Sequence, residues 1–174
     1  LVGVEIKNSI LLVDFTNHAL KNGMPLVVVE YHALPIASLT LFVPGAGAAS
    51  DPAGKGGLAA FTPDLLDEAP AGLSAIAIAE EQNRLGASIR AGVDVDSAQV
   101  SASTLTKTLD DTLGLFAKIV MQRAFKDKEA DRVKGDRVTS LELRRDRPRE
   151  VVSIMLNAAL YGRTTPYGHP SSGT

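Results

Sequence analysis

The sequence predicts an α+β domain, in which an antiparallel or mixed β-sheet is packed on one side by several α-helices to form a two-layer sandwich. Segments with period-two apolar patterns follow one another in groups, and so do segments with helical spacing. A doubly wound parallel fold would alternate single strands with single helices. The chain has 174 residues, of which 45 % are hydrophobic, and this suffices for one domain with a buried core.

Three strands are expected near the N-terminus. Ile10–Phe15 and Leu26–Tyr31 are β-branched and aliphatic runs, and Lys21-Asn22-Gly23 between them is a turn signal. These two runs are predicted to form an antiparallel hairpin. Ile36–Val43 is predicted to be a third, buried strand. Residues 44–57 are rich in glycine, alanine and proline, which predicts a loop.

Residues 57–69 are expected to form the first helix. Its inward-facing apolar positions are predicted to be Leu58, Phe61 and Leu65. Pro63 lies inside this stretch, and because proline has no N–H, the Ala59 carbonyl loses its helical partner. We therefore expect a kink, or a restart of the helix with Thr62 as N-cap and Pro63 at the first helical position.

A second helix and a second hairpin follow. Ser74 is a plausible N-cap for the helix, and Gly86 is its natural C-terminal stop. Residues 87–95 and 98–105 then alternate between apolar and polar side chains, with Asp94–Ser97 as the turn between two strands.

Three more helices are predicted in the C-terminal part of the chain. The first has an inner face of Leu109, Leu113, Phe116 and Val120. The second is capped by Asp127, ends at Pro148 and turns inward Ala130, Val133 or Lys134, Val138 and Leu141. The third covers Arg149–Tyr161, with Val151, Met155 and Ala158 on one face, and the tail from Gly162 is predicted to be a loop.

Composition excludes several classes of function. The chain carries 18 basic and 20 acidic residues, so it lacks the basic excess of a nucleic-acid surface. It contains no cysteine, which excludes disulfides, thiolate zinc sites and cysteine nucleophiles. No apolar run approaches the roughly 18 residues that a membrane-spanning helix needs.

The glycine-rich loop does not match a nucleotide-binding motif. A Walker loop would need glycine and a hydroxyl residue where the chain has Ala49 and Gly56. The dinucleotide pattern begins at Gly45 and Gly47 but ends in Ser50, and the surrounding unit is not βαβ. We interpret the segment as a flexible loop that leads into a helix.

Histidines, serines and charged runs offer no catalytic constellation. His18, His32 and His169 include no i, i+4 pair for a metal, and no G-x-S-x-G elbow occurs. Asp67-Glu68 and Asp110-Asp111 are pairs of adjacent acids that point to different helix faces, which is typical of solvated surface. The arginine-rich run 144–149 closes a helix, where positive charge complements the dipole.

Several short stretches nevertheless occur in a recognisable order. They are Leu20–Gly23 with Leu26–Glu30, Ser50–Ala59, Leu85–Ser88, Asp94–Ser103, Phe125 with Glu129 and Arg132, Leu160–Gly162, Pro166–Pro170 and Gly173-Thr174. In this order, from about His18 to the end, the chain resembles the M16 metallopeptidases, which include pitrilysin, insulin-degrading enzyme and the mitochondrial processing peptidase. The resemblance implies the α+β domain of that family.

Active members of the family carry H-x-x-E-H on the first helix, where two histidines bind zinc and the glutamate activates a water. A second glutamate from a later helix completes the ligand set. Here Ala60 replaces the first histidine, Pro63 the general base and Asp64 the second histidine, and the distal glutamate position falls on Ser140. Glu142 is the nearest carboxylate. We therefore expect no catalytic residue, no zinc and no peptidase activity of the chain alone.

The resemblance implies a partner. M16 proteins are similar to clamshells that enclose a peptide chamber, and often one half has lost the motif. We expect a non-catalytic half that supplies chamber wall and peptide contacts beside a subunit or second domain bearing H-x-x-E-H. The alternative is a scaffold subunit like the core proteins of the respiratory bc1 complex, with no role in proteolysis.

Residues 18–174 are expected to form one M16-like domain, truncated at its C-terminus because Gly173-Thr174 precedes a further helix and strands in the family. Residues 1–17 resemble a piece of a resistance-nodulation-division efflux pump that nothing continues. We treat them as a leader of uncertain origin that can include the first strand. The family's bacterial members favour a periplasmic or envelope location over a mitochondrial one.

Overall fold

A computed structural model describes residues 2–5, 23–29, 33–68, 74–121 and 127–173. The strands are β1 Val2–Glu5, β2 Leu26–Val29, β3 Ile36–Pro44, β4 Ser88–Val93 and β5 Ser97–Leu105. The helices are α2 Leu58–Glu68, α3 Ala75–Leu85, α4 Leu109–Met121, α5 Asp127–Leu143 and α6 Pro148–Tyr161. Single 3-10 turns lie at Ala48–Ser50, Thr106–Thr108, Arg144–Asp146 and Pro166–Gly168. None of the described helices is long and apolar enough to cross a bilayer.

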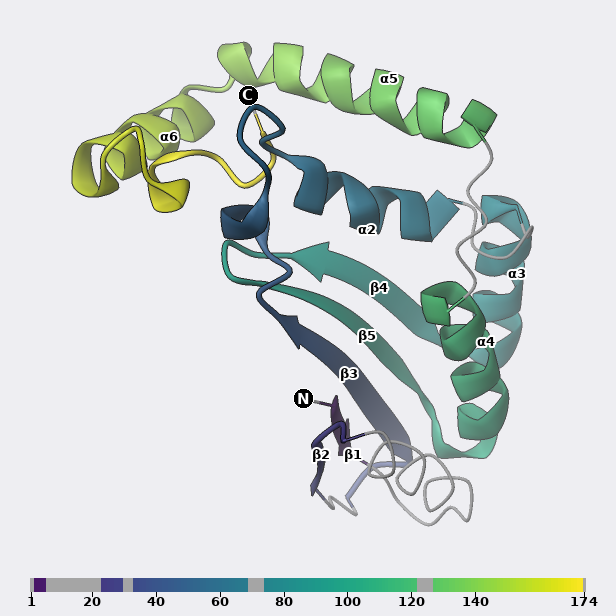
Figure 1. Cartoon of the computed structure of the whole chain (residues 1–174). Helices are drawn as coiled ribbons and strands as arrows, with labels where there is room; N and C mark the ends of the chain where they lie inside the picture. Colours follow the sequence, from purple (N-terminus) through teal and green to yellow (C-terminus); the bar gives the residue numbers. More distant parts are fainter. Residues whose placement is uncertain (1, 6–22, 30–32, 69–73, 122–126, 174) are drawn as a thin grey trace.

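The strands form one mixed sheet in the order β2-β1-β3-β5-β4. β3, β5 and β4 are antiparallel neighbours, with Leu39 opposite Ala102 and Ile89 opposite the same alanine. Figure 1 shows α2, α3 and α4 on one face of this sheet, with α5 above α2 and no described helix on the opposite face. The predicted two-layer α+β class is therefore confirmed.

The two short N-terminal strands, β1 and β2, form one side of the described sheet. β2 pairs in parallel with β1, which also pairs antiparallel with β3 and so separates β2 from its neighbour in sequence. The predicted strand Ile10–Phe15 lies outside the described residues. Its antiparallel pairing with Leu26–Tyr31 therefore stays a prediction.

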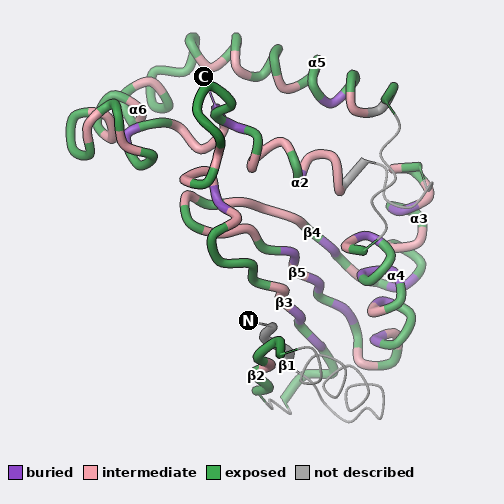
Figure 2. Tube along the Cα trace, in the orientation of Figure 1, coloured by how far each residue is buried: buried purple, intermediate pink, exposed green. Residues whose placement is uncertain are grey.

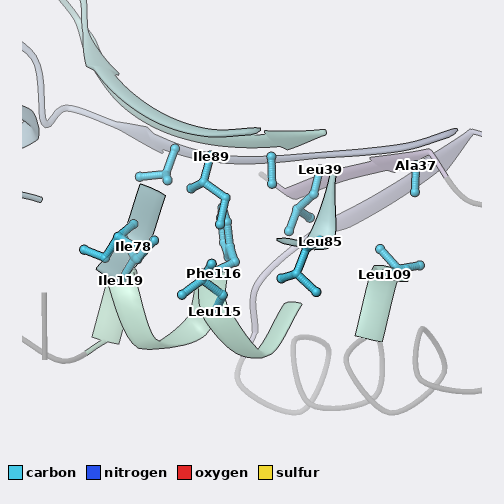
Figure 3. Close-up of a cluster of buried hydrophobic side chains, with 11 residues drawn as sticks. Ala37, Leu39, Ile78, Leu85, Ile89, Leu109, Leu115, Phe116 and Ile119 are labelled. Atoms are coloured by element: carbon cyan, nitrogen blue, oxygen red, sulfur yellow. The ribbon is translucent and has the colours of Figure 1, made fainter. Parts of the chain in front are cut away.

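The core lies between the sheet and helices α3 and α4. Alternate residues of β3, β4 and β5 point toward the helices, as the period of two requires, and Figure 2 shows buried positions alternating along β3 and β5. In Figure 3, Ile78 and Leu85 of α3 and Phe116 of α4 face the sheet near Ile89 and Leu39. The predicted strand 36–43 is thus buried on one face only.

The predicted ends of α3 and the predicted β4–β5 turn are confirmed. The Ser74 hydroxyl accepts a hydrogen bond from the Ala77 N–H at 3.2 Å, which caps α3. Gly86 ends α3 in the left-handed conformation at φ +62°, where glycine carries no Cβ penalty. The Asp94 N–H donates to the Ser97 carbonyl at 2.8 Å and closes the β4–β5 hairpin.

The outer helices are less buried than predicted. Val138 of α5 was predicted to turn inward but is 46 % exposed, and Met155, on the predicted apolar face of α6, is 63 % exposed. Leu58 of α2 is 46 % exposed and was also wrong, whereas Val133 of α5 is buried. The reason is that α5 and α6 lie away from the sheet (Figure 1), so their apolar faces border a cavity of about 480 Å³ between the two helices.

Candidate functional site

The site begins with the residues that start α2. The Asp51 carboxylate accepts hydrogen bonds from the Gly57 N–H at 2.6 Å and from the Ala59 N–H at 2.7 Å. Both amides belong to the first turn, where backbone donors have no helical partner. Asp51 therefore fixes the beginning of α2 from six residues away and places positions 60, 63 and 64 in its first two turns.

Pro63 lies inside a helix that does not restart. α2 runs from Leu58 to Glu68 with Pro63 in its interior, and the proline is buried. The predicted restart with Thr62 as N-cap is wrong, because Asp51 has already begun the helix and the Thr62 hydroxyl instead donates to the Leu58 carbonyl at 3.2 Å. Pro63 has no ionisable group and cannot accept or deliver a proton.

Asp64 is engaged by an arginine from α5. Nη1 of Arg137 donates to Oδ2 of Asp64 at 2.5 Å and to the Ala60 carbonyl oxygen at 3.2 Å. Nη2 of the same side chain donates to the Ser172 carbonyl at 2.8 Å. One guanidinium thus joins α2, α5 and the C-terminal segment, and the Arg137 side chain is only 17 % exposed.

The other predicted positions lie apart from this contact. Ser140 is exposed on α5, and the structure brings Arg137 rather than Ser140 to the Asp64 carboxylate. Glu142 is also exposed and lines the cavity between α5 and α6. The family's distal ligand position therefore contributes no carboxylate beside Asp64.

These residues do not fit a zinc ion. Ala60 supplies a methyl group, Pro63 supplies no donor, and the carboxylate of Asp64 already bonds a cationic side chain. Zinc sites require three or four nitrogen, sulfur or oxygen ligands that converge on one point. Across the described parts of the chain, no group of three or more His, Cys, Asp or Glu side chains could hold a metal ion.

A second arginine holds the C-terminal segment to the same place. Arg144 donates from Nη1 to the Gly173 carbonyl at 3.1 Å and from Nη2 to the Ser172 hydroxyl at 2.7 Å. The run 144–149 is thus more than a solvated helix end. Gly57 lies so close to this segment that a Cβ there would be 2.8 Å from the Ser172 oxygen.

The tail is also tied to the sheet. Tyr167 donates its hydroxyl to Oδ1 of Asp96 at 2.7 Å, and Asp96 lies in the β4–β5 turn. This hydrogen bond, together with the negative charge of Asp96, raises the pKa of Tyr167 above its ordinary value of 10.0. The C-terminal segment therefore contacts α2, α5 and the β4–β5 hairpin.

The remaining motif candidates have structural partners or lie outside the described residues. In the glycine-rich loop, the Gly45, Ala48 and Ala49 amides donate to carbonyls of the β4–β5 turn at 2.8–3.0 Å. These amides are therefore occupied and do not form a phosphate cradle. His18 and His32 lie outside the described residues, and His169 is exposed.

The fold and this site define a peptidase-like α+β domain whose motif helix carries no ligand pair. The model of the family "Insulinase (Peptidase family M16)" matches residues 26–174. The chain therefore belongs to the M16 family, as its sequence indicated.

Solved structures agree with this assignment. The inactive domain of a peptidase M16 from Pseudomonas fluorescens is 32 % identical, with a TM-score of 0.74 over 83 % of this chain. A protease from Helicobacter pylori is 20 % identical over 80 % of this chain, with a TM-score of 0.68, and shares the fold. This chain covers 35 % and 34 % of those two chains. A search of curated proteins found no match.

Sequence reasoning did not identify Arg137, Asp51 or the role of Arg144. Arg137 and Arg144 are seven residues apart, so they share one face of two helical turns. That spacing was a detectable signal. It did not indicate which acceptors the two guanidinium groups would reach, because these come from α2 and from the C-terminal segment.

Proposed function

We propose that this chain is a non-catalytic M16 domain that forms one half of a peptidase clamshell beside a subunit bearing H-x-x-E-H. The observation that carries this proposal is the state of the motif helix. α2 is a complete helix that is capped by Asp51 and contacts α5. Its three motif positions hold an alanine, a proline and an aspartate paired with Arg137. The relative from Pseudomonas fluorescens, which is called an inactive domain, supports the same interpretation.

The edge of the sheet supports a peptide contact. β4 is the last strand of the described sheet, and α2 lies over it. Because Asp94 and Ser97 form a hydrogen-bonded pair, alternation along the hairpin directs the amides of Ala91 and Val93 outward. Gln82 confirms this orientation, since its Oε1 accepts the outward Ile89 N–H at 2.7 Å. Extended peptides bind such edges by adding a strand.

The association can be tested with purified components. This chain and an M16 subunit that carries H-x-x-E-H should co-elute from a sizing column, and the mixture should cleave peptides faster than the catalytic subunit alone. If the two associate without any change in peptide turnover, the chain is a scaffold. If they do not associate, the clamshell role is wrong.

A further inference from the structure

Arg137 places a positive charge between the two positions where the family carries its zinc-binding histidines. Positions 60 and 64 are one helical turn apart on one face of α2. A single nitrogen, Nη1 of Arg137, bonds the carbonyl of Ala60 and the carboxylate of Asp64. The guanidinium therefore lies against both positions at once.

We infer that Arg137 is a built-in cation that takes the place of the metal in this site and excludes a divalent ion independently of the missing ligands. A guanidinium remains protonated throughout the physiological pH range and presents only N–H donors. A metal ion at the same place would meet positive charge where it needs lone pairs. This inference holds whether or not the chain assembles with a catalytic subunit.

The burial of Arg137 makes its charge effective. The side chain is 17 % exposed, and its one guanidinium donates to three acceptors from two segments, Ala60 and Asp64 of α2 and Ser172 of the tail. Water and salt screen such a charge less than one at the surface. The guanidinium is also fixed in direction by its bonds, so it cannot withdraw from the site without losing them.

Arg132, a second arginine of α5, serves as the control for Arg137. Arg132 lies on the same helix, and its Nη1 donates to Asp136 at 2.9 Å, one turn further along α5. Its side chain is 45 % exposed. Arg132 therefore has the same charge and the same helix as Arg137, but it is more exposed, and its bond to Asp136 lies within α5.

We expect that restoring the two histidine ligands alone does not restore zinc binding. Ala60→His with Asp64→His creates an i, i+4 histidine pair on α2, a common arrangement for zinc. With Arg137 in place this pair should bind zinc weakly. Adding Arg137→Gln, which removes the charge but keeps amide donors, should strengthen zinc binding roughly tenfold or more, because like charges repel strongly at short range.

Zinc titration by calorimetry on the folded full chain measures the effect, with Ala60→His/Asp64→His plus Arg132→Gln as the matched control. The control should bind zinc as weakly as the histidine pair alone. Arg137→Met is the second neutral variant, and circular dichroism checks that each protein is folded. Equal zinc affinities with and without the Arg137 charge would overturn the inference, and so would an equal gain from Arg132→Gln.

Discussion

Gly57 is the residue at which the C-terminal segment crosses the start of α2. Its φ of +95° lies in the region that favours glycine, and Ser172 and Gly173 leave no room for a side chain there. Gly173 is equally restricted, since a Cβ on it would lie 2.7 Å from the Gly56 carbonyl oxygen. The contact between the tail and the motif helix therefore depends on two glycines.

Gly57→Ala should lower the free energy of unfolding by about 2 kcal/mol, because alanine is strained at this φ and would collide with backbone. Gly56→Ala is the control, since nothing lies within 4 Å of a Cβ there and its φ is not positive. Urea denaturation of both variants measures the difference. Equal losses for the two substitutions would show that the crossing does not constrain the fold.

Arg137 and Asp64 should be energetically coupled. Arg137→Met leaves three acceptors without their charged donor and should cost about 2 kcal/mol of stability. Asp64→Asn should cost less, about 1 kcal/mol, because the Asp64 side chain is 46 % exposed and partly screened.

A double-mutant cycle in urea isolates the pair. The double variant should lose less stability than the sum of the two single losses, since each single change already removes the ion pair. Strict additivity would mean that the contact contributes nothing measurable and that Arg137 acts only through Ser172 and the Ala60 carbonyl.

At the scale of elements, the β4 edge is the feature that can be tested directly. Ala91→Pro removes one outward N–H, and proline is tolerated on edge strands when that group faces solvent. We expect weaker peptide binding by the assembled protein with little loss of fold. Ala91→Val keeps the N–H and is the matched control, and fluorescence anisotropy with a labelled extended peptide measures both. Unchanged binding in the proline variant would exclude strand addition at this edge.

The tail is anchored to the β4–β5 turn by a bond that depends on pH. Because folding raises the pKa of Tyr167 above 10.0, the stabilisation from its bond to Asp96 is present below pH 10.0 and is lost as pH rises through the higher folded value. Tyr167→Phe keeps the ring but removes the hydroxyl. The stability difference between wild type and this variant should therefore shrink above pH 10, as measured by urea denaturation at stepped pH. A difference that is constant across that range would contradict the assignment.

Elements with strong local signals were predicted well. α3 was delimited by Ser74 and Gly86 because a cap and a left-handed stop are properties of single residues. The β4–β5 hairpin followed from its period of two, and the Gly-rich segment before α2 from its composition. The α+β class follows from the grouping of these elements along the chain.

Features that depend on distant partners were not predicted. Val138 and Met155 have helical apolar spacing, but α5 and α6 do not lie on the sheet, and periodicity does not say what covers a face. The start of α2 was predicted to within one residue, but its cap, Asp51, was missed because it comes from an earlier loop. The motif positions were located from the resemblance to the family. The contact of Arg137 with Asp64 was not predicted, because it depends on α5 lying over α2, which no local pattern indicates.

At the scale of the whole molecule, we propose that this domain contributes no catalytic group to the assembled peptidase. The most direct measurement is peptide hydrolysis by the chain mixed with an H-x-x-E-H subunit in which the motif glutamate is replaced by glutamine. Because all proton transfer would depend on the partner's glutamate, we predict that this mixture is inactive while the mixture with the unmodified partner cleaves peptide. Sustained, chelator-sensitive hydrolysis by the mixture with the glutamine variant, or by this chain alone, would contradict the account.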